Sequence, residues 1–193
     1  MKKRFVIFSL VVLCLSIKAQ AQRYLSGQTG LQFTLGTVNG LNLDTKSQNF
    51  SFHFGAKYST YTKNSNRWVI GCDFLEKRHP YKDISIPQTQ ITGEAGYFLK
   101  FLSNGSKTTF FSLGASAVAG YETINWGEKL LSDGARIENR DNFIYGGAIT
   151  LETEFFLSDR IVLLINIRER LLGGSSVGKL NTQLGIGLKF ILN

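Results

Sequence analysis

Two pairs of charged residues at strand-like spacing could carry out chemistry together. Glu152 and Glu154 are two residues apart, and so are Arg168 and Arg170 in the next segment. Paired carboxylates suit general acid–base catalysis. Residues two apart in a strand face the same way, however, so the acidic pair can instead neutralise the basic pair on a neighbouring strand. We interpret the four as structural charges of a buried ion-pair ladder, completed by other charges on the same polar face: Asp73, Glu94, Lys100, Glu122 and Lys189.

The other residues that could do chemistry do not form a recognisable site. His53 and His79 are the only histidines, and they lack the spacing of a metal site or a nearby cysteine. Gly185 and Gly187 lie within an alternating segment with no helix after it, so they do not form a phosphate loop. Cys72 falls on the apolar face of its segment, with Trp68, Ile70 and Phe74, and fits the role of a small hydrophobic residue. We therefore expect no catalytic residue, no metal, no cofactor and no small-molecule substrate, and we expect that the chain is not an enzyme.

The first 21 residues have the pattern of a secretory signal peptide. Lys2, Lys3 and Arg4 precede an apolar stretch from Phe5 to Leu15, and Ala19-Gln20-Ala21 forms a small-x-small cleavage site. The alternatives are an uncleaved anchor and a lipid anchor at Cys14. We predict a signal peptide at 1–21 and one domain at 22–193. Four basic residues and no acidic ones lie in the signal, so the net charge of +8 falls to +4. The remaining basic residues are scattered, and we expect no direct contact with nucleic acid.

Period-two alternation of apolar and polar residues recurs along the rest of the chain and predicts strands. In one example, Phe50, Phe52 and Phe54 alternate with Ser51 and His53. Each such segment is long enough for a tilted membrane strand. There are eight of them, at 30–38, 49–60, 67–76, 89–100, 108–123, 143–156, 161–170 and 181–192.

The connections between these segments alternate in length. We expect short turns at 61–66, 103–105 and 158–160, and long loops at 39–48, 77–88, 124–142 and 171–180, with both prolines in the second loop. Short turns at one end and long loops at the other are typical of an outer-membrane barrel. The predicted fold class is all-β: an eight-stranded antiparallel up-and-down β-barrel of outer-membrane type, after a cleaved signal peptide.

A soluble β-sandwich or a lipocalin-like barrel would show the same alternation, so period alone does not decide between them. Aromatic residues near both ends of the strands favour the membrane barrel, because they resemble two interfacial girdles. Trp68 and Phe190 lie toward the turn end, and Tyr121 and Tyr145 toward the loop end. A barrel of eight strands is filled by its own side chains, so we do not expect porin activity.

The chain also resembles a known family, the TraO family of conjugative-transposon transfer proteins. The resemblance covers the mature chain, and its segments are 81–83, 86–87, 110–116, 120–123, 125–128, 140–152, 157–160 and 168–170. It implies a non-enzymatic part of a conjugation apparatus that acts during DNA transfer between cells. No catalytic residues are carried over from this family.

Taken together, these features lead to the hypothesis of an outer-membrane component of a type IV-like transfer apparatus. Its partners would be outer-membrane lipid and other conjugal transfer proteins. The longest loop, with Trp126, Arg136 and Arg140, is the candidate contact surface, and the alternative is that this loop only covers its own barrel. Other hypotheses are a barrel for adhesion or envelope stability, and a soluble periplasmic accessory protein.

Overall fold

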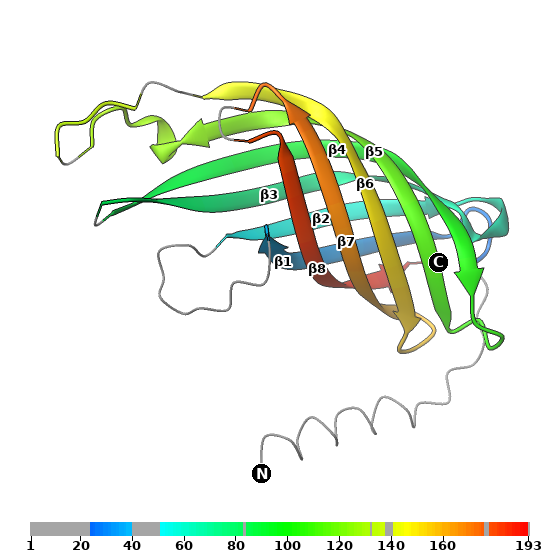
Figure 1. Cartoon of the computed structure of the whole chain (residues 1–193). Coiled ribbons are helices and arrows are strands. Elements are labelled where there is room, and N and C mark those ends of the chain that lie inside the picture. Colours follow the sequence, from blue (N-terminus) through cyan, green and yellow to red (C-terminus); the bar gives the residue numbers. More distant parts are fainter. Residues whose placement is uncertain are drawn as a thin grey trace, which may run out of the picture.

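The computed structural model describes residues 24–39, 51–82, 84–131, 133–137, 141–175 and 178–192. The signal peptide predicted at 1–21 lies outside these residues. The described chain folds into eight strands (Figure 1). They are β1 (Thr29–Val38), β2 (Phe52–Tyr61), β3 (Arg67–Tyr81), β4 (Ile84–Ser103), β5 (Thr109–Ile124), β6 (Asn142–Phe156), β7 (Ile161–Gly173) and β8 (Leu180–Ile191).

Each strand pairs antiparallel with the next, and β1 pairs with β8 to close the barrel. At this closing seam Phe33 lies opposite Leu188, and Leu35 lies opposite Ile186. Closure removes the open sheet edges of the barrel wall, which an isolated sheet would have to protect. The prediction of a closed, eight-stranded, antiparallel up-and-down barrel is confirmed.

The alternation in the sequence becomes a separation between the inside and the outside of the barrel. Along β7, Val162, Leu164, Asn166, Arg168 and Arg170 are buried, and the residues between them are half-buried or exposed. Most buried polar residues of the described chain carry charges or amides, and large aliphatic and aromatic side chains cover the exterior. Soluble proteins show the reverse distribution, because charged side chains are rarely buried. A polar interior and an apolar exterior are typical of outer-membrane barrels. No helix in the described chain is long and apolar enough to cross a membrane.

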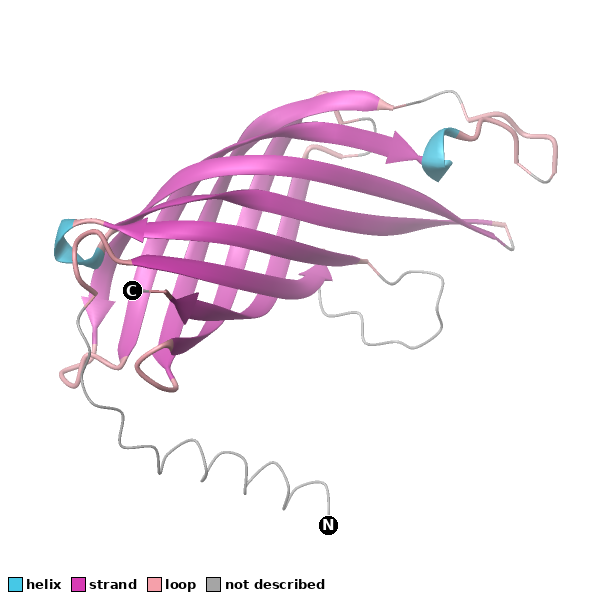
Figure 2. Cartoon of the chain, turned by 180° about the vertical axis from the view of Figure 1, so that it is seen from behind, coloured by secondary structure: helices cyan, strands magenta, loops and turns pink. Residues whose placement is uncertain are grey.

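The two ends of the barrel differ. Short connections at 62–66, 104–108 and 157–160 define what we call the turn end, and β1 begins and β8 ends there. The opposite end, which we call the loop end, carries the longer connections. The β3–β4 hairpin and the residues 125–131 and 133–137, which we call the 125–137 segment, project from it, as Figures 1 and 2 show from opposite sides.

The long loop expected at 77–88 is a β-hairpin, so that prediction was wrong. β3 and β4 continue past the barrel wall and pair as far as Tyr81 opposite Ile84. Residues 78–81 and 84–87 pair only with each other, and a proline is tolerated in such an edge strand because its missing N–H can face away from the partner. Lys82 has a φ of 51°, which suits a two-residue hairpin turn. The Lys-Asp turn lacks the Asn-Gly signal that would have identified it.

The segment after β5 is built on a strained turn. Asn125 and Trp126 have φ values of 51° and 54°, in the left-handed region that bulky residues rarely adopt. A short antiparallel contact follows, in which Leu130 pairs with Arg136. Trp126 is 63% exposed, so the strained turn presents an indole ring at the surface.

Candidate functional site

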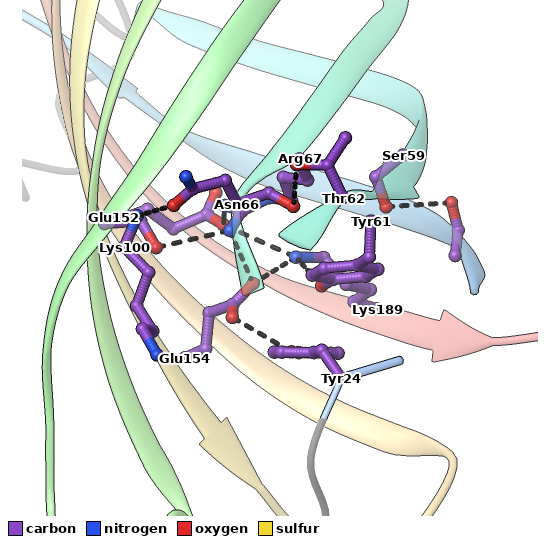
Figure 3. A network of polar contacts seen from close by, with 12 residues as sticks. Tyr24, Ser59, Tyr61, Thr62, Asn66, Arg67, Lys100, Glu152, Glu154 and Lys189 are labelled. Atoms are coloured by element: carbon purple, nitrogen blue, oxygen red, sulfur yellow. Dashed lines mark hydrogen bonds and ion pairs between the residues drawn. The ribbon is translucent and has the colours of Figure 1, made fainter. Parts of the chain in front are cut away.

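Four charged side chains near the turn end form a network that we call the turn-end cluster: Arg67, Glu152, Glu154 and Lys189 (Figure 3). Nη2 of Arg67 lies 2.5 Å from Oε1 of Glu152, and its Nη1 lies 3.3 Å from Oε1 of Glu154. Lys189 pairs with both carboxylates. Two cations and two anions balance, so the cluster is neutral. All four are almost completely buried, and buried charges are stable only when they are paired in this way.

Tyr24 packs inside the turn end of the barrel, next to the turn-end cluster. Its ring stacks on Tyr61 with the centroids 3.8 Å apart, and it packs against Phe110 and Phe156. Its hydroxyl donates a hydrogen bond of 2.9 Å to Oε2 of Glu154. Figure 3 shows Tyr24 pointing toward Glu154 and Tyr61. The segment before β1 therefore places an aromatic ring inside the turn end.

A second balanced network lies further along the lumen. In this mid-barrel cluster, Arg168 contacts both Asp73 and Glu94, and Nζ of Lys57 lies 2.5 Å from Oε1 of Glu94. The four residues come from β2, β3, β4 and β7, so the contacts cross the interior. The two clusters together tie the walls of the barrel to each other.

The pairing expected between Glu152–Glu154 and Arg168–Arg170 was wrong, although all four side chains are buried in the lumen. The register of β6 and β7 places Asn166 opposite Glu152 and Thr150 opposite Arg168. The acidic pair therefore lies nearer the turn end than the basic pair, and each pair finds partners across the lumen. Nη2 of Arg170 donates to the hydroxyl of Thr92 over 3.0 Å.

Amides replace most charges in the lumen near the loop end. The Nε2 groups of Gln88 and Gln90 both donate to Oε2 of Glu122 over 2.8 Å, and the hydroxyl of Ser175 donates to the same oxygen. Lys77 donates to Oδ1 of Asn181. Buried polar side chains thus occupy the lumen at the turn end, at mid-barrel and near the loop end, which fits the narrow interior of an eight-stranded barrel.

The histidines and the cysteine do not meet. His53 is buried in the lumen on β2, whereas His79 lies on the projecting hairpin and contacts Oε1 of Gln88 at 2.9 Å. Cys72 is exposed on the outer face of β3. Within the described ranges, no three side chains of His, Cys, Asp or Glu gather closely enough to hold a metal ion.

The candidate contact surface at the loop end is partly described. Trp126 and Arg136 are exposed, and Arg140 lies outside the described residues. The segment is clasped to the β3–β4 hairpin: Nζ of Lys82 lies 2.5 Å from Oδ2 of Asp133, and the hydroxyl of Tyr81 donates to the same oxygen. The hydrogen bond from Lys82 lowers the pKa of Asp133, and Asp133 raises the pKa of Lys82. The hairpin and the longest loop thus form one composite surface.

Two important residues of the turn end were missed in the sequence. Arg67 begins a strand, and it lies on the polar face because Trp68 beside it faces out; parity alone could have identified it. Tyr24 lies ahead of the first alternating segment, so no periodic signal marked it. Its role depends on aromatic residues from β2, β5 and β6, which only the closed barrel brings together.

The family pattern described as conjugative transposon protein TraO matches residues 25–192, which include all eight strands. The chain belongs to the TraO family. None of the curated protein sequences matches the chain. The TraO match covers both charged clusters and the composite loop surface, so these features belong to the family domain and not to an added segment.

Solved outer-membrane barrels resemble this TraO chain in fold. Neisserial surface protein A is 13% identical, with 89% of this chain and 100% of that chain covered and a TM-score of 0.53. Ail of Yersinia pestis is 16% identical, with 86% and 100% covered and a TM-score of 0.49. The N-terminal barrel of Pseudomonas aeruginosa OprF is 11% identical, with 85% and 99% covered and a TM-score of 0.45. Identities this low report on fold alone, and the first comparison supports an outer-membrane type of barrel.

Proposed function

We propose that this TraO chain is a non-enzymatic component of the conjugative transfer apparatus in the outer membrane. The proposal rests on one observation: a chain of a conjugative transposon family has its charged side chains inside the barrel and its apolar side chains outside, the reverse of a soluble protein. Charged networks fill the lumen, and an apolar surface surrounds the barrel. Burying such an exterior in lipid removes it from water, which contributes roughly 25 cal/mol per Å² of apolar surface.

The aromatic residues of the exterior support this location. Trp68 and Tyr97 pack together at the turn end, with ring centroids 4.8 Å apart, and Phe143 and Tyr145 stack at the loop end at 6.4 Å. Aromatic side chains at two levels suit the two interfaces of a bilayer. The loop end then faces the cell exterior and the turn end faces the periplasm, as is usual for barrels with short periplasmic turns.

A structural role in the apparatus fits the filled lumen better than a role as a conduit. The buried ion pairs of both clusters occupy the interior, and a DNA strand has no path past Arg67 and Arg168 without their disruption. We propose that the composite loop surface contacts other transfer proteins. Trp126 is the expected anchor, because exposed tryptophans are common hot spots of protein interfaces.

Deletion of the gene, with wild-type complementation, tests the proposal. We expect transfer frequency to fall on deletion and to return with the wild-type chain. Unchanged transfer together with lost cell adhesion or envelope integrity would instead support the adhesion or envelope-stability hypothesis. Recovery of the chain in the soluble periplasmic fraction would support the soluble accessory protein.

A further inference from the structure

We propose that the outer face of the β1–β8 seam binds one phospholipid of the periplasmic leaflet. An acyl chain would lie in an apolar groove, and its phosphate would lie beside Arg160. The inference rests on the proposed outer-membrane location and adds a specific lipid site to it.

The groove is a hollow of about 380 Å³ over the seam where the barrel closes. Outward side chains of β1, β2, β7 and β8 form its walls, and the backbone at Thr34 and Gly187 forms its floor. The side chain opposite Phe33 on β2 is Ala56, which leaves space between Phe33 and Phe54. Its apolar walls include Phe33, Leu35, Phe54, Ile186, Leu188 and Phe190.

The position and the lining of the groove favour an acyl chain. Its walls are apolar, and it runs along β8 from Ile186 to Phe190, within the belt that the bilayer would surround. Its volume falls within the usual range of about 300–1,000 Å³ for small-ligand sites. A hollow at this depth is filled in a membrane by something apolar, because empty space forfeits contacts that its walls would otherwise make.

The backbone of Arg160 lies near the turn end of the groove. Phe190 lies opposite Ile161, the residue that follows Arg160, and the N–H of Ile191 donates to the carbonyl of Arg160 over 2.8 Å. The Arg160 side chain is exposed at the level where lipid phosphates would lie. A guanidinium matches the geometry of a phosphate, to which it can donate two hydrogen bonds.

The charges around Arg160 allow a phosphate to bind there. Asp159 is the adjacent acidic group and opposes binding, but each of the other two turns carries an exposed or half-buried lysine, Lys63 and Lys107. The rim of the turn end therefore has more cations than anions among these turn residues. A juxtamembrane basic residue strengthens the binding of anionic lipid by roughly fivefold. Arg160 is the turn cation next to Ile161, which lies opposite the groove residue Phe190.

Native mass spectrometry of the full mature chain, purified from outer membranes in detergent and supplemented with phosphatidylglycerol, tests the site. We expect the wild type to retain one phosphatidylglycerol. Ile186→Trp fills the groove and should abolish the bound species. Ile149→Trp makes the same change at another outward isoleucine, away from the groove, and should retain the lipid. Arg160→Gln should weaken binding about fivefold, and Lys107→Gln should not change it.

Several outcomes would overturn the site. The first is a wild type that retains no phosphatidylglycerol, and the second is equal retention of the lipid by Ile186→Trp and the wild type. The third is a dimer mass in the wild type that is lost in Ile186→Trp, which would make the groove a contact between two copies of the chain. Lipid loss with Ile186→Trp but not with Arg160→Gln would refute the phosphate contact. Heat-modifiable gel mobility separates these outcomes from misfolding. A wild type without heat-modifiable mobility would contradict the proposed membrane barrel, whereas a heat-modifiable wild type without bound lipid would contradict only the lipid site.

Discussion

Arg67 shows how a single buried charge is held in this barrel. The side chain is 1% exposed, and its guanidinium pairs with two carboxylates and lies over the ring of Phe98 with its carbon 4.6 Å from the centroid. Removing one partner of such a network leaves the others as uncompensated charges, which costs more than the interaction itself contributed. The turn-end cluster is therefore a sensitive point for barrel stability.

Arg67→Met should lower the free energy of unfolding by about 3–5 kcal/mol, because Glu152 and Glu154 lose their shared cation. Urea unfolding in detergent micelles, followed by tryptophan fluorescence, measures the change. Lys63→Met alters an exposed lysine of the neighbouring turn and should stay within about 0.5 kcal/mol. Adding Glu152→Gln to Arg67→Met should recover part of the loss. Equal stability of Arg67→Met and wild type would show that the cluster does not support the barrel.

Tyr24 allows its hydrogen bond and its packing to be separated. Tyr24→Phe removes only the hydroxyl that donates to Glu154 and should cost about 1.5–3 kcal/mol. Tyr24→Ala also removes the ring from the aromatic group and should cost about 3–5 kcal/mol. Tyr145→Phe, on the exposed outer face, is the control and should change little. If Tyr24→Ala unfolds at the same urea concentration as wild type, Tyr24 does not seal the barrel.

The sequence predicted that several charges face inward but not which of them meet. Strand parity placed Glu152, Glu154, Arg168 and Arg170 on the polar face correctly. Arg67 and Glu152, however, are 85 residues apart and belong to strands that are not neighbours, so only the closed cross-section brings them together. The register, which depends on the whole barrel, decided the pairing.

At the scale of elements, the β3–β4 hairpin and the 125–137 segment differ from ordinary loops. The hairpin continues its strands beyond the barrel wall, and Asp133 of the neighbouring segment joins it through Tyr81 and Lys82. The period-two alternation of apolar and polar residues predicted the eight strands, and the gaps between them predicted connections of alternating length. The hairpin was not, because its two prolines and its Lys-Asp turn favour a loop when local sequence alone is considered.

The clasp between Lys82 and Asp133 should depend on pH in both directions. The pKa of Asp133 is lowered, so its stabilising contribution is lost as pH falls through that lowered value; the pKa of Lys82 is raised, so its contribution is lost as pH rises through the raised value. The clasp should therefore persist across the neutral range. Both groups are exposed, so the effect concerns local order in the loops and not global stability.

Carboxyl ¹³C chemical shifts of Asp133 during a pH titration measure this effect. Lys82→Met should move the pKa of Asp133 back toward that of an ordinary aspartate. The remaining shift would come from the N–H of Ala135 and the hydroxyl of Tyr81, which also donate to this carboxylate. Lys129→Met, another loop lysine, should leave the titration unchanged. An unchanged titration in Lys82→Met would contradict the clasp.

In the molecule as a whole, the charged lumen stabilises the barrel and the projecting loop end offers a surface for contacts. The balanced clusters hold the barrel walls together, and the loop end presents Trp126 on a strained turn. Strained backbone often accompanies a functional site, because the fold must support the less favourable conformation. This arrangement suits a stable membrane platform that displays a contact surface.

Trp126→Ala should lower transfer frequency by about tenfold or more if the indole is an anchor of a partner interface, since hot spots contribute about 2 kcal/mol or more. Mating assays with the complemented deletion strain measure the effect. Trp68→Ala is matched in chemistry and in exposure, 59% against 63%, but lies at the opposite end and should leave transfer near the wild-type level. Equal transfer by Trp126→Ala and wild type would remove Trp126 from the interface.

The proposal above requires a closed barrel embedded in the outer membrane. Gel mobility of the chain from isolated outer membranes, compared with and without boiling, tests this requirement. A barrel held by hydrogen-bonded closure of β1 on β8 and by the buried charge clusters should stay folded in detergent and migrate faster when unboiled. A single band of unchanged mobility, or a chain absent from the outer-membrane fraction, would contradict the account.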